Sequence, residues 1–278
     1  MSDTTTEHAC REIVVNFSRP KRLRYGLAIP GRRRLMHMLQ VLGVFAILIA
    51  LWQGVSPLWS VSVRQVVADP WSVCRYLVNN AGSSLSNVRV TGMEAVVGYA
   101  VGNALGFVLG ISCHVLRRAG KAVFPFLVVA QAVPVITLSS IVILWFGNGL
   151  GARAALAGYL CFFPMTLNVY RGLESIDPHA LKVARAFGAS FLFELIEVKL
   201  PYIVPSIFVA LRAGVVLAMS GAIVGELFGA NAGLGAMLLS GLYYQTATLV
   251  WSSILLAGIL SLICFAIIGT AQRRLAWW

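Results

Sequence analysis

The chain has 278 residues, of which 59% are hydrophobic and only 12% are charged, and its mean hydropathy is +0.83. A soluble domain carries about twice this charged fraction, so the composition excludes an ordinary water-soluble fold. The net charge of +12 would suit a nucleic-acid-binding protein, but no aromatic platform or binding motif accompanies the basic residues. We therefore expect a membrane protein that does not bind nucleic acid.

The first part of the chain, residues 1–34, is a basic segment that we expect to set topology or to contact anionic membrane lipid. Beyond it, charge-free windows of about 20 residues are long enough to cross the hydrocarbon core as helices. We predict an all-α, polytopic membrane protein with about six transmembrane helices. These spans are roughly 36–57, 92–113, 123–146, 152–170, 203–228 and 248–270.

Between the first two spans, residues 56–89 contain Trp59 and Trp71, which favour an interfacial helix. We group residues 35–84 as the first span with this segment. Arg212 lies inside the fifth span, near its expected cytoplasmic end, where it can snorkel or pair.

Basic residues gather on one side of the predicted membrane: the N-terminal segment, the loops after spans two and four, and the end 273–278. The opposite side keeps Arg64, Arg75, Arg89 and Arg153. The positive-inside rule therefore places both termini and the loop 177–205 in the cytoplasm.

That loop reads DPHALKVARAFGASFLFELIEVKLPYIVP. Asp177 suits a helix N-cap and Pro178 suits the first helical position. Gly188 then interrupts, and Ser190 can cap a second short helix that we expect to stop near Leu200–Pro201. Two short helices joined by a glycine would form a compact projection.

Span two carries a glycine every fourth residue, at Gly98, Gly102, Gly106 and Gly110. One stripe of this helix therefore lacks side chains and allows close approach of another helix. We favour packing within one subunit over a dimer interface.

Ionisable and strongly polar residues are few in the spans. Glu94 is expected at the outer edge of span two, and Gln131, Asn168 and Glu226 are candidates for lining a translocation path. The four histidines and five cysteines do not cluster, so we expect no metal site and no catalytic site.

Gly120–Lys121 lacks the upstream glycine and the following Ser or Thr of a Walker A loop. Any ATPase would be another chain, which would bind the ATP–Mg; this chain needs no cofactor.

Several residues of the loop follow one family's pattern. Ala184, Gly188 and Leu200–Pro201 resemble the EAA motif of ABC-importer permeases, although Lys182 stands where that family often has glutamate and Val183 where it often has alanine. Residues 133–149 (VPVITLSSIVILWFGNG) and 221–235 (GAIVGELFGANAGLG) look like segments of the nitrate, sulfonate and taurine branch. The resemblance covers roughly residues 85–272.

The resemblance implies the transmembrane domain of a type I ABC importer, a multi-pass protein of the bacterial inner (plasma) membrane. Its partners would be two ATP-binding cassette subunits, a second permease copy in a homodimer and a periplasmic substrate-binding protein. The cargo would be a small solute, nitrate-, sulfonate- or taurine-like or a vitamin precursor. The residues implied in ATPase coupling are Lys182, Ala184, Arg185, Gly188, Ala189, Leu200 and Pro201.

Two other functions remain open at this stage. An ion-coupled secondary carrier should show ionisable residues near the membrane midplane and often an inverted repeat, and neither is evident. A non-transport membrane scaffold would need no chemistry at all. Copurification of an ATPase separates both from the importer.

Overall fold

The computed structural model describes residues 31–58, 63 and 66–275. Within these residues the regular structure is helical, as predicted. In chain order the elements are α2 (Gly31–Val55), η1 (Ser56–Leu58), α4 (Pro70–Asn79), α5 (Ala81–Val115), α6 (Arg117–Ala130), α7 (Val135–Phe146), α8 (Leu150–Glu174), α9 (Pro178–Ala186), α10 (Phe191–Phe193), the π-helical turn η2 (Glu194–Lys199), α11 (Leu200–Glu226), α12 (Leu234–Tyr243) and α13 (Ala247–Leu275).

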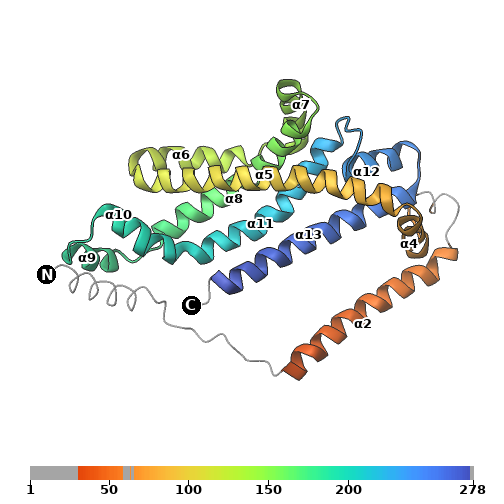
Figure 1. The fold of residues 1–278 in the computed structure, drawn as a ribbon, viewed down its shortest axis with the longest axis horizontal. Coiled ribbons are helices and arrows are strands. Elements are labelled where there is room, and N and C mark those ends of the chain that lie inside the picture. The colour runs from red at the N-terminus through yellow and green to blue at the C-terminus, as the bar shows by residue number, and fades with distance from the viewer. Residues whose placement is uncertain (1–30, 59–62, 64–65, 276–278) are drawn as a thin grey trace.

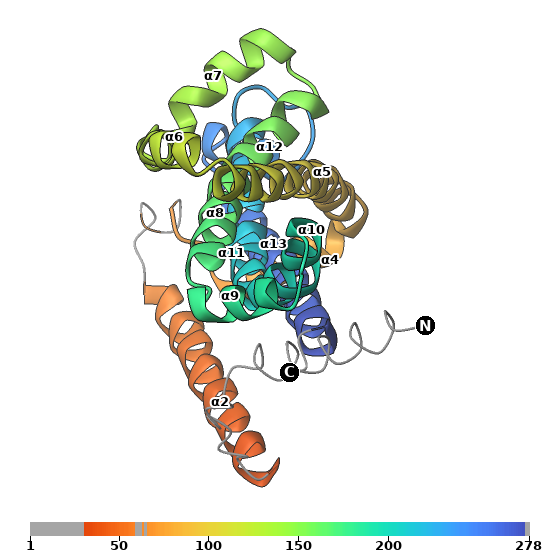
Figure 2. The same cartoon turned by 90° about the vertical axis from the view of Figure 1, so that its left-hand side faces the viewer.

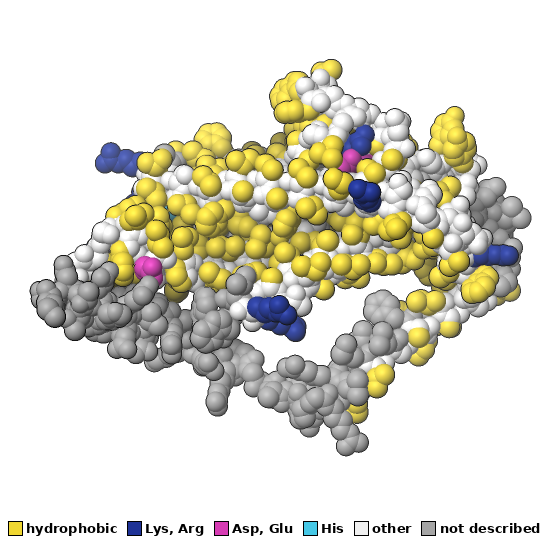
Figure 3. Space-filling view, viewed as in Figure 1, with side chains coloured by type: hydrophobic (Ala, Val, Ile, Leu, Met, Phe, Trp, Pro, Cys, Tyr) yellow, Lys and Arg dark blue, Asp and Glu magenta, His cyan; other side chains and the backbone are white. Residues whose placement is uncertain are grey.

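The long helices α5, α8, α11 and α13 form an elongated bundle (Figure 1). Helices α9 and α10 lie at one end of it, which we call the hairpin end, and α4 and α12 lie at the other, the far end. Figure 2 shows α2 pointing away from the bundle and α7 on the opposite side. Hydrophobic side chains cover most of the face seen in Figure 3, as expected of a surface in contact with lipid.

Within the described residues, four helices are long and apolar enough to cross a membrane: 81–115, 150–174, 191–226 and 247–274. A bent pair, α6 with α7, brings the number to five where the sequence predicted about six. The first predicted span, 36–57, falls on α2, where the described apolar stretch is Ala46–Val55.

The third predicted span, 123–146, is not one straight helix. Helix α6 ends at Ala130 and α7 begins at Val135, and the two meet at 101°. Pro134 has no N–H to donate and disfavours helical geometry at Val133, so the chain turns before α7 can begin. The predicted span 123–146 is therefore broken at residues 131–134, and the bent pair α6 and α7 still counts as one candidate span.

Helices α5 and α8 approach closely along the glycine stripe. Gly98, Gly102, Gly106 and Gly110 are all buried, and each lies against the backbone or side chains of α8. On α8 the facing positions are also mostly small, among them Ala157 and Gly158. In this structure the stripe is therefore occupied by a helix of the same chain.

Helix α4 begins where the sequence places an N-cap. The Asp69 side chain accepts a hydrogen bond from the Ser72 amide (Oδ2 to N, 3.0 Å), and Pro70 takes the first helical position. Burial raises the pKa of Asp69, but the hydrogen bonds from Ser72 outweigh it and lower that pKa overall. The helix packs on α13, and Trp59 of the expected interfacial segment lies outside the described residues.

Candidate functional site

The loop 177–205 folds into a hairpin whose first arm is α9. Asp177 Oδ1 accepts a hydrogen bond from the His179 amide at 2.8 Å, and Pro178 is the first helical residue. Both features follow from the local sequence, because an aspartate acceptor and a proline without an N–H suit a helix start.

Helix α9 ends in a Schellman motif centred on Gly188. The Ala189 amide donates to Ala184 O at 3.1 Å, and the Gly188 amide donates to Arg185 O at 2.9 Å. Gly188 has φ +82°, the left-handed conformation that glycine adopts without penalty. Ala184 is fully buried and packs against Val198 and Ala189, so the two arms are held together by small and β-branched side chains.

The second arm of the hairpin is longer than the sequence predicted. Ser190 does cap it, accepting a hydrogen bond from the Phe193 amide at 3.2 Å. The helix does not stop near Leu200–Pro201, however, but runs on from Phe191 to Glu226. The π-helical turn shifts the hydrogen-bond register just before Pro201, which cannot donate, so the proline is accommodated inside one long helix.

The tip of the hairpin is exposed and rich in apolar side chains. Phe187 is 57% exposed, Phe191 56% and Leu192 63%, and Gly188 at the turn and Lys182 on α9 are also exposed. A Cβ at Gly188 would meet no atom of this chain within 4 Å. The tip therefore presents an open apolar surface at the end of the bundle (Figure 1).

An ionic cluster lies at the base of the hairpin. Arg185 donates to both carboxylate oxygens of Glu194, at 2.8 and 3.1 Å, and Lys199 Nζ lies 2.8 Å from Glu194 Oε1. Lys199 Nζ is also 3.2 Å from His114 Nε2 of α5, and His114 Nδ1 is 3.0 Å from Glu174 Oε1 of α8. The hydrogen bonds and the charge of Glu194 raise the pKa of Arg185.

Sequence reasoning identified Arg185 but missed Glu194, which pairs with it, and also missed Lys199 and His114, which extend the same series of contacts. Glu194 and Lys199 are buried, 1% and 3% exposed. Two charges of opposite sign at the start of a long apolar helix are a signal that they need partners.

A second buried ion pair lies nearer the far end. Arg153 Nη1 donates to Glu94 Oε1 at 2.7 Å, and Arg153 Nη2 donates to Asn148 Oδ1 at 2.9 Å. Glu94 lies on α5, which begins at Ala81, and Arg153 lies in the first turn of α8. Each charge is buried because it has the other as its partner.

Breaking this pair should destabilise the bundle. We expect Arg153→Met to lower the free energy of unfolding by about 3–5 kcal/mol, since it leaves the Glu94 carboxylate buried and unpaired. The double variant Arg153→Met/Glu94→Leu should recover most of the loss, because neither charge then remains. Thermal unfolding of the purified variants in detergent measures both, and equal losses in the two would contradict the prediction.

Glu226, a third candidate for path lining, lies buried between α5, α11 and the start of α12. It is fully buried, accepts a hydrogen bond from Thr91 Oγ1 at 2.6 Å and accepts another from the Gly235 amide at 2.5 Å. Thr91 Oγ1 in turn accepts from the Leu234 amide at 2.7 Å. In this conformation Glu226 fastens α11 to α5 and to the start of α12 rather than facing an open path.

Gln131 and Asn168, the other candidates for path lining, are not brought together. Gln131 is exposed at the break between α6 and α7, close to where Tyr159 OH donates to Ala130 O at 2.7 Å. Asn168 donates to Pro164 O at 2.8 Å. It lies nine residues beyond Tyr159 on α8, which is about 13.5 Å along the helix at 1.5 Å per residue. The structure therefore gives no polar cluster formed by these residues.

Arg212 is half-buried on the continuous helix 191–226. Its guanidinium carbon lies 5.6 Å from the centre of the Phe265 ring on α13. At this distance the ring stabilises the cation.

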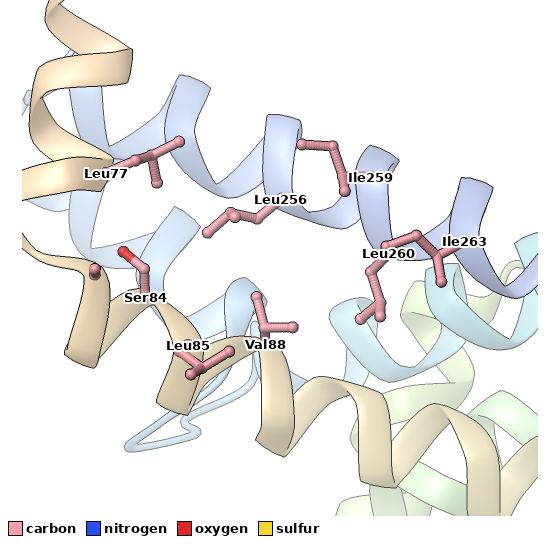
Figure 4. Close-up of a pocket in the computed structure, with 9 residues that line it drawn as sticks. Leu77, Ser84, Leu85, Val88, Leu256, Ile259, Leu260 and Ile263 are labelled. Atoms are coloured by element: carbon pink, nitrogen blue, oxygen red, sulfur yellow. The ribbon is translucent and has the colours of Figure 1, made fainter.

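A groove between α5 and α13 is lined by apolar side chains, with Ser84 at one side (Figure 4). Leu85, Val88, Leu256 and Leu260 point into it, so it lacks the convergent polar groups that orient a small polar solute. Within the described residues, no group of three or more His, Cys, Asp or Glu could hold a metal ion.

The chain matches a known protein family. Residues 102–276 match the family described as "Binding-protein-dependent transport system inner membrane component". A formylaminopyrimidine transport permease protein, ThiX, of Halalkalibacterium halodurans is 31% identical over 80% of this chain and 91% of its own length. A probable ABC transporter permease protein of Haemophilus influenzae is 28% identical over 87% and 98%.

The names of other relatives refer to other solutes. A putative aliphatic sulfonates transport permease protein, SsuC, of Bacillus subtilis is 26% identical over 90% of each chain. A solved structure of the MetNI methionine ABC transporter in inward-facing conformations matches the fold with a TM-score of 0.56 and 20% identity, over 66% of this chain and 93% of that one. The chain belongs to the family of binding-protein-dependent transport system inner membrane components, the permease subunits of ABC transporters.

Proposed function

We propose that this chain forms the membrane pathway of an ATP-driven importer for a small solute and is driven by a separate ATPase through the hairpin 177–205. The observation that carries the proposal is the hairpin itself. Its arms are fixed by the Schellman motif at Gly188 and by burial of Ala184, while its apolar tip stays exposed at the end of the bundle. A rigid projection with an exposed apolar tip suits docking into a groove on another protein.

The hairpin also suits the transmission of force, because its second arm is continuous with α11. The helix runs from Phe191 to Glu226 without a break, so displacement of the tip would move a membrane-spanning helix directly. In this proposal Lys182 and Arg185 lie on the first arm, Gly188 and Ala189 form its turn, and Leu200–Pro201 lie where the arm enters the membrane. The permease would then switch between inward-open and outward-open states as a two-state element.

Family membership supports the remaining partners. Two ATPase subunits that bind ATP–Mg, a second copy of this chain and a substrate-binding protein on the periplasmic side would complete the importer in the inner membrane. Both termini and the hairpin would lie in the cytoplasm, in keeping with the basic loops.

The solute is proposed from the relatives. Their names refer to aliphatic sulfonates, taurine, formylaminopyrimidine and riboflavin, so we infer a sulfonate- or taurine-like compound or a vitamin precursor. The carboxylates of Glu94 and Glu226 are hydrogen-bonded within this chain, Glu94 to Arg153 and Glu226 to Thr91.

A mild-detergent purification of the tagged chain from its own host, with ATPase activity measured on the eluate, tests the proposal. We expect a stoichiometric ATP-binding subunit, and we expect it to be lost when residues 182–201 are scrambled in a chain that still inserts. A wild-type chain that elutes without any ATPase would move the function to a carrier or a scaffold. Uptake of radiolabelled taurine, an alkanesulfonate and formylaminopyrimidine by proteoliposomes of the complex then separates the solute classes.

A further inference from the structure

Four separate elements meet in the ionic cluster at the base of the hairpin. Arg185 comes from α9, Glu194 and Lys199 from the π-helical turn, and His114 and Glu174 from the ends of α5 and α8. The contacts form a continuous chain from Arg185 through Glu194, Lys199 and His114 to Glu174, with every link between 2.8 and 3.2 Å. We call these five residues the strut.

The strut fixes the protonation of its histidine. The Lys199 ammonium group can donate hydrogen bonds but cannot accept them, so His114 Nε2 must be the acceptor in this contact. His114 Nε2 therefore carries no proton. The ring proton then sits on Nδ1 and is donated to Glu174 Oε1. With two cations, two carboxylates and a neutral imidazole, the strut is electrically balanced.

Stability alone does not account for such a cluster. Glu194, Lys199 and His114 are 1%, 3% and 7% exposed, and removing charges from water costs about as much as their pairing returns. Replacing a buried ion pair by apolar side chains of similar volume is often neutral or stabilising. Directional hydrogen bonds differ from apolar packing in that they specify one geometry, and here they specify how the hairpin sits on α5 and α8.

The chain itself joins the hairpin to α8, through residues 175–177, and to α11, with which the second arm is continuous, but not to α5. We propose that the strut makes the hairpin move α5 and α8 together with α11, and that His114 and Lys199 are positioning residues for this transmission. This inference rests on the proposed function, since it assigns to the hairpin a second mechanical connection into the bundle.

The first test uses hydrogen–deuterium exchange on the purified full chain in nanodiscs. His114→Leu removes both links of the histidine, whereas His114→Gln can still accept from Lys199 and donate to Glu174. We expect exchange in peptides spanning 178–190 to rise about tenfold in His114→Leu and to stay within about twofold of wild type in His114→Gln, while α12 is unchanged in both. Lys199→Met, which removes the central charge at similar length, should behave like His114→Leu and serves if that variant fails to insert.

The second test asks whether motion is transmitted. In the complex purified with its ATPase, trapping with ATP and vanadate should change exchange in α5 (residues 99–115) and in α11. His114→Leu should lose the change in α5 and keep it in α11, and His114→Gln should keep both. A change in α5 that survives in His114→Leu, or unaltered hairpin exchange in the first test, would overturn the strut. A wild-type chain that captures no ATPase would overturn the proposed function, and the nanodisc experiment would still decide whether the strut holds the hairpin.

Discussion

Gly102→Leu should prevent α5 and α8 from packing and so abolish the folded bundle. A Cβ on Gly102 would lie 2.6 Å from Gly158 Cα and 2.8 Å from the Gly158 carbonyl carbon, both of them backbone atoms that cannot rotate away. The two helices would have to separate, and theirs is the most extensive helix–helix contact in the described structure. Overpacking typically costs about 1–3 kcal/mol, and because the obstructing atoms here are backbone we expect a cost at or above the top of that range, a large fraction of the stability of an ordinary domain.

Gly82→Leu is the matched control, because Gly82 lies on the same helix and a Cβ there would meet nothing within 4 Å. Size-exclusion profiles of a fluorescent fusion and the thermal midpoint in detergent measure both variants. We expect aggregation or loss of the monodisperse peak for Gly102→Leu and a near-wild-type profile for Gly82→Leu. A Gly102→Leu chain with an unchanged thermal midpoint would show that the glycine stripe of α5 does not pack against α8.

The parts of the fold that could be predicted from sequence depend on local chemistry. Charge-free stretches predicted α5, α8, α11 and α13. In a membrane the backbone N–H and C=O groups of such a stretch must hydrogen-bond to one another, and a helix achieves this. The start of α9 at Pro178 follows from the same kind of short-range signal.

Helix breaks were harder to predict, because proline alone does not decide them. Pro125, Pro164 and Pro205 all lie inside helices, whereas at Pro134 the chain bends by 101° between α6 and α7. Neighbouring helices can re-satisfy the carbonyl that a proline leaves free, and that depends on the tertiary structure. The continuation of α11 through Pro201 was missed for the same reason.

The polar contacts could not be predicted because they join distant positions. Glu94 and Arg153 are 59 residues apart, and Lys199 and His114 are 85 apart. Sequence can show that a buried charge needs a partner, but the choice of partner follows from which helices pack together. Gln131 and Asn168 were proposed as path-lining residues on polarity alone, and polarity carries no information about whether two residues share a cavity.

Gly188→Asp should abolish ATPase capture and transport while leaving membrane insertion intact. The left-handed φ of +82° costs an aspartate or asparagine less than other residues, and a side chain there would point into open space, so the hairpin itself should keep its shape. The new charge would lie at the exposed tip that also carries Phe187 and Phe191, where a docking partner would have to bury it. An unpaired charge buried in an interface costs several kcal/mol, so we expect capture to fall by more than about a hundredfold.

Gly188→Asn separates charge from shape, since asparagine has the same size, tolerates the same φ and carries no charge. We expect Gly188→Asn to keep a measurable part of the capture that Gly188→Asp loses, with both variants inserted at wild-type levels by protease protection of their loops. Because the two variants share their backbone cost, the difference between them reports contact at the tip rather than damage to the hairpin. A Gly188→Asp chain that captures its ATPase and transports normally would show that the tip of the hairpin is not the coupling surface.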